Sequence, residues 1–188
     1  MPQGDPLKRV ALITGANQGI GLETSRQLGK QGITVVVGSR DERRGQKAVD
    51  TLRGEGIDAR LSVIDVLDPA TIERAAAEIE RDFGRLDILV NNAGILRERT
   101  APTASQLEDL RETFETNVFG LFAVTKAFLP LLRKSAAGRI VNVSSALGSL
   151  ATMSDPQRLE NKSLAYSSSK AAVNMMTVAL AREAGWPS

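Results

Sequence analysis

The sequence predicts an α/β fold: a Rossmann-type, doubly wound parallel sheet in a single domain. Short apolar, partly β-branched runs alternate with helical patterns along the chain, which is the order of βαβ units in a parallel sheet. The first run, residues 10–13, leads into a glycine-rich turn and then into a helical stretch through Leu28. Because 188 residues suit a single core, we expect one domain over residues 1–188, with residues 1–7 as an N-terminal tail.

The next strands and helices follow from hydrophobic spacing and capping residues. Further strands are expected at residues 34–38, 60–64, 86–90 and 139–143. Asp68 and Pro69 supply an N-cap and a proline at the first helical position. The buried face of the helix that they begin is predicted from apolar residues at helical spacing, namely Ile72, Ala75, Ala76, Ile79 and Phe83.

A long helix is predicted from a capping box at residues 105–108, where Ser105 is followed three positions later by Glu108. Its expected apolar stripe consists of Leu107, Leu110, Phe114, Val118, Leu121 and Phe122. A last helix is expected over residues 164–183. The stretch before it, residues 146–163, is the longest irregular one, and we expect it to be an active-site loop.

The composition excludes several classes of function. The chain has no histidine and no cysteine, which removes Ser-His-Asp hydrolases, His-ligated metal sites and thiolate chemistry. We therefore expect no metal site, and an acid–base catalyst must be a Tyr, Lys, Asp or Glu side chain. A net charge of +2 is too small to indicate a nucleic-acid partner. No apolar stretch is long enough to span a membrane, and we expect a cytoplasmic protein. The expected partner is a small-molecule substrate.

The turn after the first strand has the spacing Gly-x-x-x-Gly-x-Gly, from Gly15 to Gly21. Strand, glycine-rich turn and helix together are the context of a dinucleotide-binding fingerprint, because glycines let the backbone approach a pyrophosphate at the helix N-terminus. A turn with glycines for conformational reasons alone is the alternative. The expected cofactor contacts in this turn are Gly15, Asn17, Gln18, Gly19, Ile20 and Gly21.

Tyr166 and Lys170 are spaced i and i+4, so they lie on the same face of the last predicted helix. An ammonium beside a phenol favours the phenolate form, and a tyrosine in that setting can exchange a proton near neutral pH. Taken alone, the spacing also fits a solvated helix face.

With Thr14 before the glycines and Tyr166 and Lys170 behind them, the chain resembles the short-chain dehydrogenase/reductase family over residues 8 to about 184. The resemblance implies an oxidoreductase that binds a nicotinamide dinucleotide. It also implies an adenine contact from Asp65 and Val66, and cofactor contacts from Asn92, Ala93 and Gly94 after the fourth strand.

The same resemblance implies a catalytic tetrad of Asn117, Ser145, Tyr166 and Lys170. Ser145 and Tyr166 would hydrogen-bond the substrate carbonyl, Tyr166 would transfer the proton, and Lys170 would also bind the nicotinamide ribose. Asn117 would hold a water that connects Lys170 to solvent. Ser144 competes with Ser145 for the serine role, and Asn117 is also compatible with a purely structural, satisfied polar residue.

The choice of cofactor depends on the residues after the second strand. An acidic residue there binds the ribose 2′-hydroxyl of NAD, whereas arginine accommodates the 2′-phosphate of NADP. The position is occupied by Ser39 and is followed by Arg40 and, one helical turn on, by Arg44. These residues favour NADP(H), while Asp41 leaves NAD(H) possible. A solvated helix start is the alternative for this charged segment.

Two departures from the family pattern bear on function. Extra residues over 153–162 resemble a shorter form of the insertion of carbonyl reductases, which favours ketone or aldehyde reduction. Family members continue beyond the last helix with further strands and a substrate-binding segment. We therefore expect either an incomplete chain or a truncated, catalytically impaired dinucleotide-binding paralogue. A sugar-nucleotide epimerase or dehydratase of the extended family is a third alternative, and the Gly-x-x-x-Gly-x-Gly spacing and the short length count against it. By analogy with the family we expect a homodimer or homotetramer.

Overall fold

A computed structural model of the protein describes residues 8–97, 100–155 and 163–184. The predicted tail at residues 1–7 and the later half of the predicted loop, from 156 to 162, lie outside this range. The chain divides into two compact units: residues 1–93 with 121–141, and residues 94–120 with 142–188. Each unit is described by itself, and the single-domain organisation stays a prediction.

The sheet has five strands in the order β3-β2-β1-β4-β5. Their bounds are β1 (Val10–Ile13), β2 (Thr34–Ser39), β3 (Ala59–Val63), β4 (Ile88–Asn91) and β5 (Arg139–Asn142). β1 pairs in parallel with both β2 and β4, and β2 pairs in parallel with β3. The predicted α/β, Rossmann-type fold is confirmed, and each strand lies within two residues of its predicted position.

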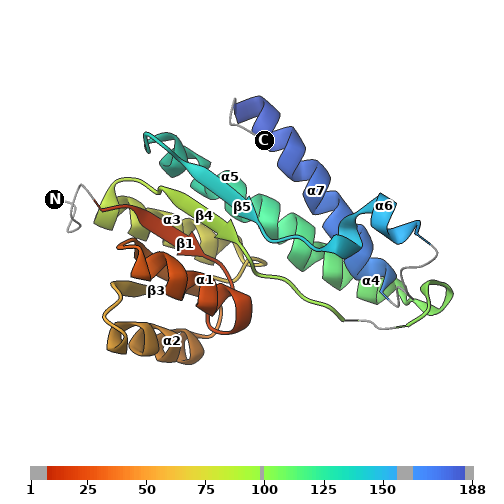
Figure 1. Cartoon of the computed structure of the whole chain (residues 1–188), viewed down its shortest axis with the longest axis horizontal. Coiled ribbons are helices and arrows are strands. Elements are labelled where there is room, and N and C mark those ends of the chain that lie inside the picture. The colour runs from red at the N-terminus through yellow and green to blue at the C-terminus, as the bar shows by residue number, and fades with distance from the viewer. Residues whose placement is uncertain (1–7, 98–99, 156–162, 185–188) are drawn as a thin grey trace. The chain divides into compact units, whose positions relative to one another are not determined.

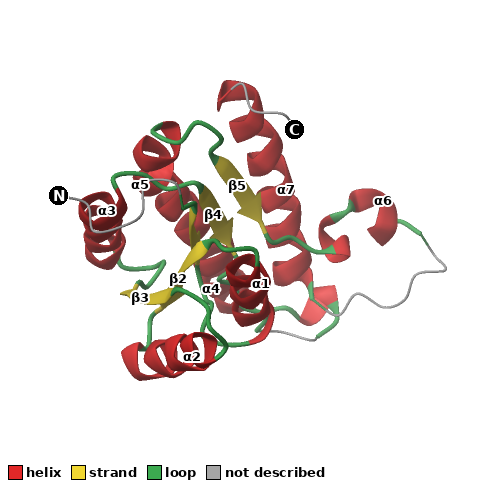
Figure 2. Cartoon of the chain, turned by 60° about the vertical axis from the view of Figure 1, so that its left-hand side comes forward, coloured by secondary structure: helices red, strands yellow, loops and turns green. Residues whose placement is uncertain are grey.

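Helices cover both faces of the sheet in the first unit (Figures 1 and 2). They are α1 (Gly19–Lys30), α2 (Glu42–Gly54), α3 (Pro69–Phe83) and α5 (Leu121–Arg133). The chain moves toward one sheet edge through α1 and α2 and toward the other through α3 and α5. Because parallel crossovers are right-handed, these two pairs of helices lie on opposite faces. α3 also packs against α5.

The central strands are buried over their whole length, which explains their continuous apolar sequence. Every residue of β1 and β2 is buried, as expected for parallel strands covered on both faces. The largest fully buried side chains of this core include Leu12, Ile13, Val35, Val37, Leu52, Leu89 and Phe128. The predicted cap of α3 is confirmed: an Asp68 carboxylate oxygen accepts from the backbone N–H of Ala70 at 3.0 Å, with Pro69 in the first turn.

The second unit contains α4 (Leu107–Phe114), the short α6 (Leu150–Met153) and α7 (Leu164–Ala184). α4 is followed directly by η2, a π-helical turn (Glu115–Gly120), and then by α5. Two 3₁₀ turns, η1 (Pro102–Ala104) and η3 (Ala146–Gly148), complete the unit. α7 packs against α4, η2 and η3.

Two predictions for the long helix are wrong. The capping box is not formed, because the N-cap residue of α4 is Gln106 rather than Ser105, and it makes no side-chain capping bond. The apolar stripe is interrupted as well, since Leu107 is 62% exposed and Phe122 is 48% exposed. A π-helical turn holds an extra residue, so it interrupts the 3.6-residue period of the helix. A single helical period therefore does not describe residues 107–122.

Gly45 on α2 tests how closely this helix packs on the sheet. A Cβ added there would overlap the Leu61 side chain and lie 2.9 Å from Ser39 Cβ. We expect Gly45→Ala to lower the free energy of unfolding by about 1–3 kcal/mol, because the helix must move off β3. Gly54→Ala, at the end of the same helix, meets nothing within 4 Å and should raise stability by about 0.5–1 kcal/mol. Urea unfolding of the two variants checks this, and shifts of the same sign would contradict the packing described here.

Candidate functional site

The predicted cofactor residues of the first unit lie where parallel strands end. The glycine-rich turn follows β1, Ser39 ends β2, Asp65 follows β3 and Asn92 follows β4. Parallel strands end at the same edge, so these segments share the carboxyl edge of the sheet. The strand order reverses between β1 and β4, which is where open α/β sheets bind ligands.

The glycine-rich turn has the backbone conformation that the sequence pattern predicts. Gly15 and Gly19 have φ angles of 62° and 58°, in the left-handed region that favours glycine. A Cβ on Gly21 would lie 2.5 Å from Asn92 Nδ2 and 2.7 Å from the Gly15 carbonyl oxygen. Gly21 therefore permits a close approach between the turn and the segment after β4.

In the first turn of α1, no side chain occupies the backbone N–H groups that could bind an anion. Gln18, the N-cap residue, makes no side-chain capping hydrogen bond, and the first turn contains no acidic residue. Gln18 and Ile20 are exposed and Asn17 is half-buried. A helix N-terminus of this kind has backbone N–H groups and a positive dipole end available for a phosphate.

Thr14 and Asn92 connect the glycine-rich turn to the segment after β4. Thr14 Oγ1 accepts from the backbone N–H groups of Asn92 at 3.1 Å and Ala93 at 3.0 Å. Asn92 Nδ2 donates to the carbonyls of Thr14 at 2.9 Å and Gly15 at 3.1 Å. Thr14, which is 2% exposed, was not among the predicted site residues. Its place directly before the first glycine is the signal that points to it.

The residues after β2 separate into structural and available groups. Ser39 is buried, and its hydroxyl donates to the Asp41 carbonyl at 2.8 Å. Asp41 is the N-cap of α2: Oδ1 accepts from Arg44 N–H at 2.9 Å, and Oδ2 lies 3.5 Å from Arg44 Nε. Arg40 is exposed, and the Arg44 side chain is 68% exposed. Both guanidinium groups are thus open to a ligand.

The other predicted cofactor residues occupy turns. Asp65 is half-buried, and Oδ1 accepts from the Leu67 N–H at 3.0 Å, while Val66 beside it is also half-buried. Ala93 is half-buried. Gly94, at the start of the second unit, is exposed.

All four predicted catalytic residues belong to the second unit. Lys170 is the charged residue among them. It is 5% exposed, and burial lowers the pKa of its ammonium below the usual value of 10.5. Nζ donates to the Val143 carbonyl at 2.7 Å and lies 5.5 Å from the centre of the Tyr166 ring. The predicted i, i+4 pairing on one helix face is present, with Tyr166 half-buried. Since Val143 supplies one acceptor, the other N–H groups of the ammonium remain for a ligand.

Asn117 lies in the π-helical turn η2 and is 1% exposed. Its Oδ1 accepts from the Ile95 N–H at 2.8 Å, and its Nδ2 donates to the Ile95 carbonyl at 3.0 Å. Nδ2 also donates to Ser169 Oγ at 3.1 Å, and Ser169 in turn donates to the Tyr166 carbonyl at 2.7 Å. The Asn117 amide therefore fixes the segment after β4 and the helix turn that carries Tyr166 and Lys170.

The two candidate serines have different surroundings. Ser144 Oγ donates to Asn174 Oδ1 at 2.6 Å and lies 3.4 Å from the Lys170 carbonyl oxygen. Ser145 Oγ accepts from the Leu147 N–H at 3.2 Å and caps η3. An accepting hydroxyl keeps its own proton for donation elsewhere. The Ser144 proton is therefore already donated to Asn174, whereas Ser145 uses its oxygen as an acceptor.

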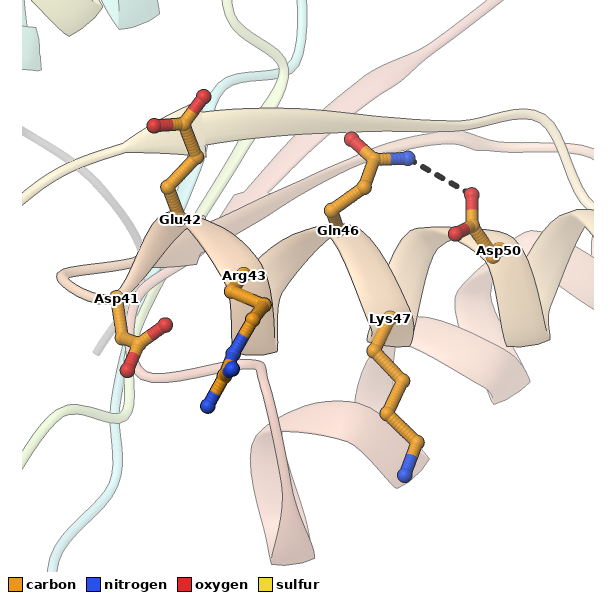
Figure 3. A pocket seen from close by; sticks show the side chains of 6 residues that line it. All are labelled: Asp41, Glu42, Arg43, Gln46, Lys47 and Asp50. Atoms are coloured by element: carbon orange, nitrogen blue, oxygen red, sulfur yellow. Dashed lines mark hydrogen bonds between the residues drawn. The ribbon is translucent and has the colours of Figure 1, made fainter.

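Figure 3 shows a shallow hollow that is lined only by the N-cap and the first turns of α2. Its lining residues are Asp41, Glu42, Arg43, Gln46, Lys47 and Asp50, and Gln46 Nε2 donates to Asp50 Oδ1 at 2.7 Å. Charges of both signs are mixed along this exposed helix flank, and the predicted catalytic residues do not contribute to it. No group of acidic residues that could hold a metal ion occurs in the part of the chain that the structure describes. Within the same residues, no helix is long and apolar enough to cross a membrane.

Comparison with known proteins assigns the family. The family model described as short chain dehydrogenase matches residues 9–186. The chain belongs to the short-chain dehydrogenase family. This family of oxidoreductases is the one that the sequence motifs resemble.

Curated members of the short-chain dehydrogenase family share up to about two-fifths of the aligned residues. The chain is 43% identical to a (+)-neomenthol dehydrogenase of Arabidopsis thaliana over 76% of its length, and it spans 55% of that protein. It is 42% identical to carbonyl reductase [NADPH] 1 of Mus musculus over 72% of its length, and it spans 48% of that protein.

Solved structures of short-chain dehydrogenases have the same fold. A variant of actinorhodin polyketide ketoreductase with NADPH superposes with a TM-score of 0.84 at 35% identity, covering 97% of this chain and 67% of that one. A gluconate 5-dehydrogenase from Burkholderia cenocepacia, in complex with NADP and tartrate, gives a TM-score of 0.82 at 32% identity and covers 93% of this chain and 65% of that one.

The buried ammonium of Lys170 makes a prediction about stability and pH. Its pKa is lowered in the folded protein, so between that pKa and about 10.5 the unfolded chain binds more protons than the folded one. Stability contributed by this group therefore rises with pH in that window. We expect the free energy of unfolding of the native protein, relative to Lys170→Met, to increase as the pH rises toward about 10.5. Urea unfolding at a series of pH values measures this, and parallel pH profiles would show that the lysine is not buried as described.

Proposed function

We propose that this short-chain dehydrogenase is an NADP(H)-dependent oxidoreductase that interconverts a ketone or aldehyde and the corresponding alcohol, with Tyr166 as the general acid and base. The observation that carries the proposal is the placement of Lys170. It is a buried ammonium over the Tyr166 ring, held by the Val143 carbonyl. The carbonyl reductases and the ketoreductase among the similar proteins support the same reaction class.

The first unit has a suitable binding group for each phosphate of NADP(H). The uncapped N-terminus of α1, with the left-handed Gly19 beside it, suits the pyrophosphate. Arg40 and Arg44 are exposed cations that suit a 2′-phosphate. Asp41 is the one residue that favoured NAD, and both its carboxylate oxygens are directed to Arg44. This arrangement supports NADP(H) over NAD(H).

NADPH, when bound, supplies the hydride that reduces the carbonyl carbon. Tyr166 donates its phenolic proton to the carbonyl oxygen, on which negative charge develops. The free O–H of Ser145 donates a hydrogen bond to the same oxygen and stabilises that charge. The remaining N–H groups of Lys170 would bind the ribose hydroxyls, and its positive charge would stabilise the Tyr166 oxygen as the proton leaves.

Asn117 has a positioning role in this proposal. Its amide is bonded to Ile95 and Ser169, so its side chain anchors the Tyr166–Lys170 turn.

Tyr166→Phe tests the catalytic role. The variant keeps the ring beneath the Lys170 ammonium but has no proton to transfer. We expect kcat for a panel of ketones with NADPH to fall by about 10²–10⁴-fold, while the Kd for NADPH changes little. Steady-state kinetics and fluorescence titration of NADPH measure the two quantities. Retention of more than about a tenth of the activity would rule out Tyr166 as the proton donor.

Arg40→Asp tests the choice of cofactor, with Arg43→Asp as a control of equal charge on the same exposed segment. A lost charge-assisted contact is worth about 1.5–3 kcal/mol, so we expect the Kd for NADPH to rise by roughly 10–100-fold and that for NADH to change far less. Arg43→Asp should leave the ratio of the two Kd values nearly unchanged. Equal effects of both substitutions would mean that Arg40 acts only through net charge.

A further inference from the structure

Asn174 on α7 contacts the chain on both sides of Ser145. Its Oδ1 accepts from Ser144 Oγ at 2.6 Å, and its Nδ2 donates to the Gly148 carbonyl at 3.2 Å. One amide side chain thus bonds the residue directly before Ser145 and the residue three positions after it. All of these residues belong to the second unit.

Gly148 brings this turn against α7 at the level of Lys170. A Cβ on Gly148 would lie 2.7 Å from the carbonyl carbon of Lys170 and 2.8 Å from Lys170 Cβ. The Gly148 N–H donates to the Ser145 carbonyl at 2.9 Å. The turn that begins at Ser145 is therefore in direct contact with the backbone of the residue that carries the buried ammonium.

Asn174 lies four residues after Lys170, so the two side chains occupy the same face of α7. Asparagine is a weak helix former, and its place inside this helix is explained by its two hydrogen bonds. The face of α7 that supplies the ammonium also fixes both ends of the serine turn. The distance between Ser145 and the Tyr166–Lys170 pair is thereby set by a single helix.

We propose that Asn174 is a positioning residue that holds the Ser145 hydroxyl in register with Tyr166. The inference rests on the proposed function, and it specifies how Ser145 is aligned for that reaction. Ser145 Oγ is itself directed by the Leu147 N–H at 3.2 Å, within the turn that Asn174 clamps. Without Asn174, Ser144 and Gly148 lose their bonds to this side chain, and the O–H group that donates to the substrate oxygen is less firmly fixed.

Asn174→Ala is the test, and Met175→Ala is its matched control, because Met175 is the next residue on the helix and is 68% exposed. A misplaced catalytic group reduces the rate rather than binding, so we expect kcat to fall by about tenfold with KM for the ketone nearly unchanged. Met175→Ala should keep the native kcat. In a Ser145→Ala background, Asn174→Ala should cause no further loss of kcat, because its effect passes through Ser145.

Amide hydrogen exchange gives a readout that does not depend on activity. In Asn174→Ala we expect faster exchange in a peptide covering residues 144–149, with the thermal midpoint measured alongside. Faster exchange there with an inactive native protein would support the clamp and refute the proposed function. Native exchange and native kcat in Asn174→Ala, or a further loss of kcat in the Ser145→Ala background, would overturn the inference.

Discussion

The buried ammonium of Lys170 is the interaction on which the second unit depends. A lysine that is almost fully buried carries a desolvation cost, and here the Val143 carbonyl and the face of the Tyr166 ring offset part of it. Val143 also belongs to the second unit, so this bond ties α7 to the segment at residue 143. Asn117 and Ser169 support the same helix turn through further hydrogen bonds. The contacts that keep the Lys170 ammonium away from solvent also align the side chains that are proposed to transfer a proton.

The first unit builds its site mainly from backbone. Thr14 and Asn92 together bond the glycine-rich turn to the segment after β4, and Gly21 allows the two to meet. These contacts leave the N-terminus of α1 uncapped by any side chain. The result is a positively polarised turn at the strand-order reversal, where a phosphate needs few side chains to bind it.

Much of this arrangement was predictable from the sequence, for identifiable physical reasons. Short apolar runs located the strands to within two residues, and this signal is clearest for β1 and β2, which are parallel strands buried over their whole length. Asp68 and Pro69 located the start of α3, since caps act within one turn. The i, i+4 spacing of Tyr166 and Lys170 placed both on one helix face for the same reason. Sequence patterns predict a feature correctly where the contacts that determine it lie within one strand or one helical turn.

Other features depend on contacts between distant segments, and the sequence did not show them. The π-helical turn η2 leaves no periodic signature, so the stripe through Leu107 and Phe122 was misassigned. The partners of the Asn117 amide, Ile95 and Ser169, lie 22 and 52 positions away. Asn174 carried the same hint as Asn117, a weak helix former inside a helix, and its bonds to Ser144 and Gly148 became visible only in three dimensions.

A crystal structure with NADP⁺ bound tests the central claim most directly, because it fixes the Tyr166 hydroxyl relative to the reactive C4 of the nicotinamide. The account predicts that the Tyr166 and Ser145 hydroxyls face that carbon, near enough for one substrate oxygen to reach both, with Lys170 on the ribose hydroxyls. A Tyr166 hydroxyl directed away from the nicotinamide, or a Lys170 ammonium without contact to the ribose, would contradict the proposed chemistry.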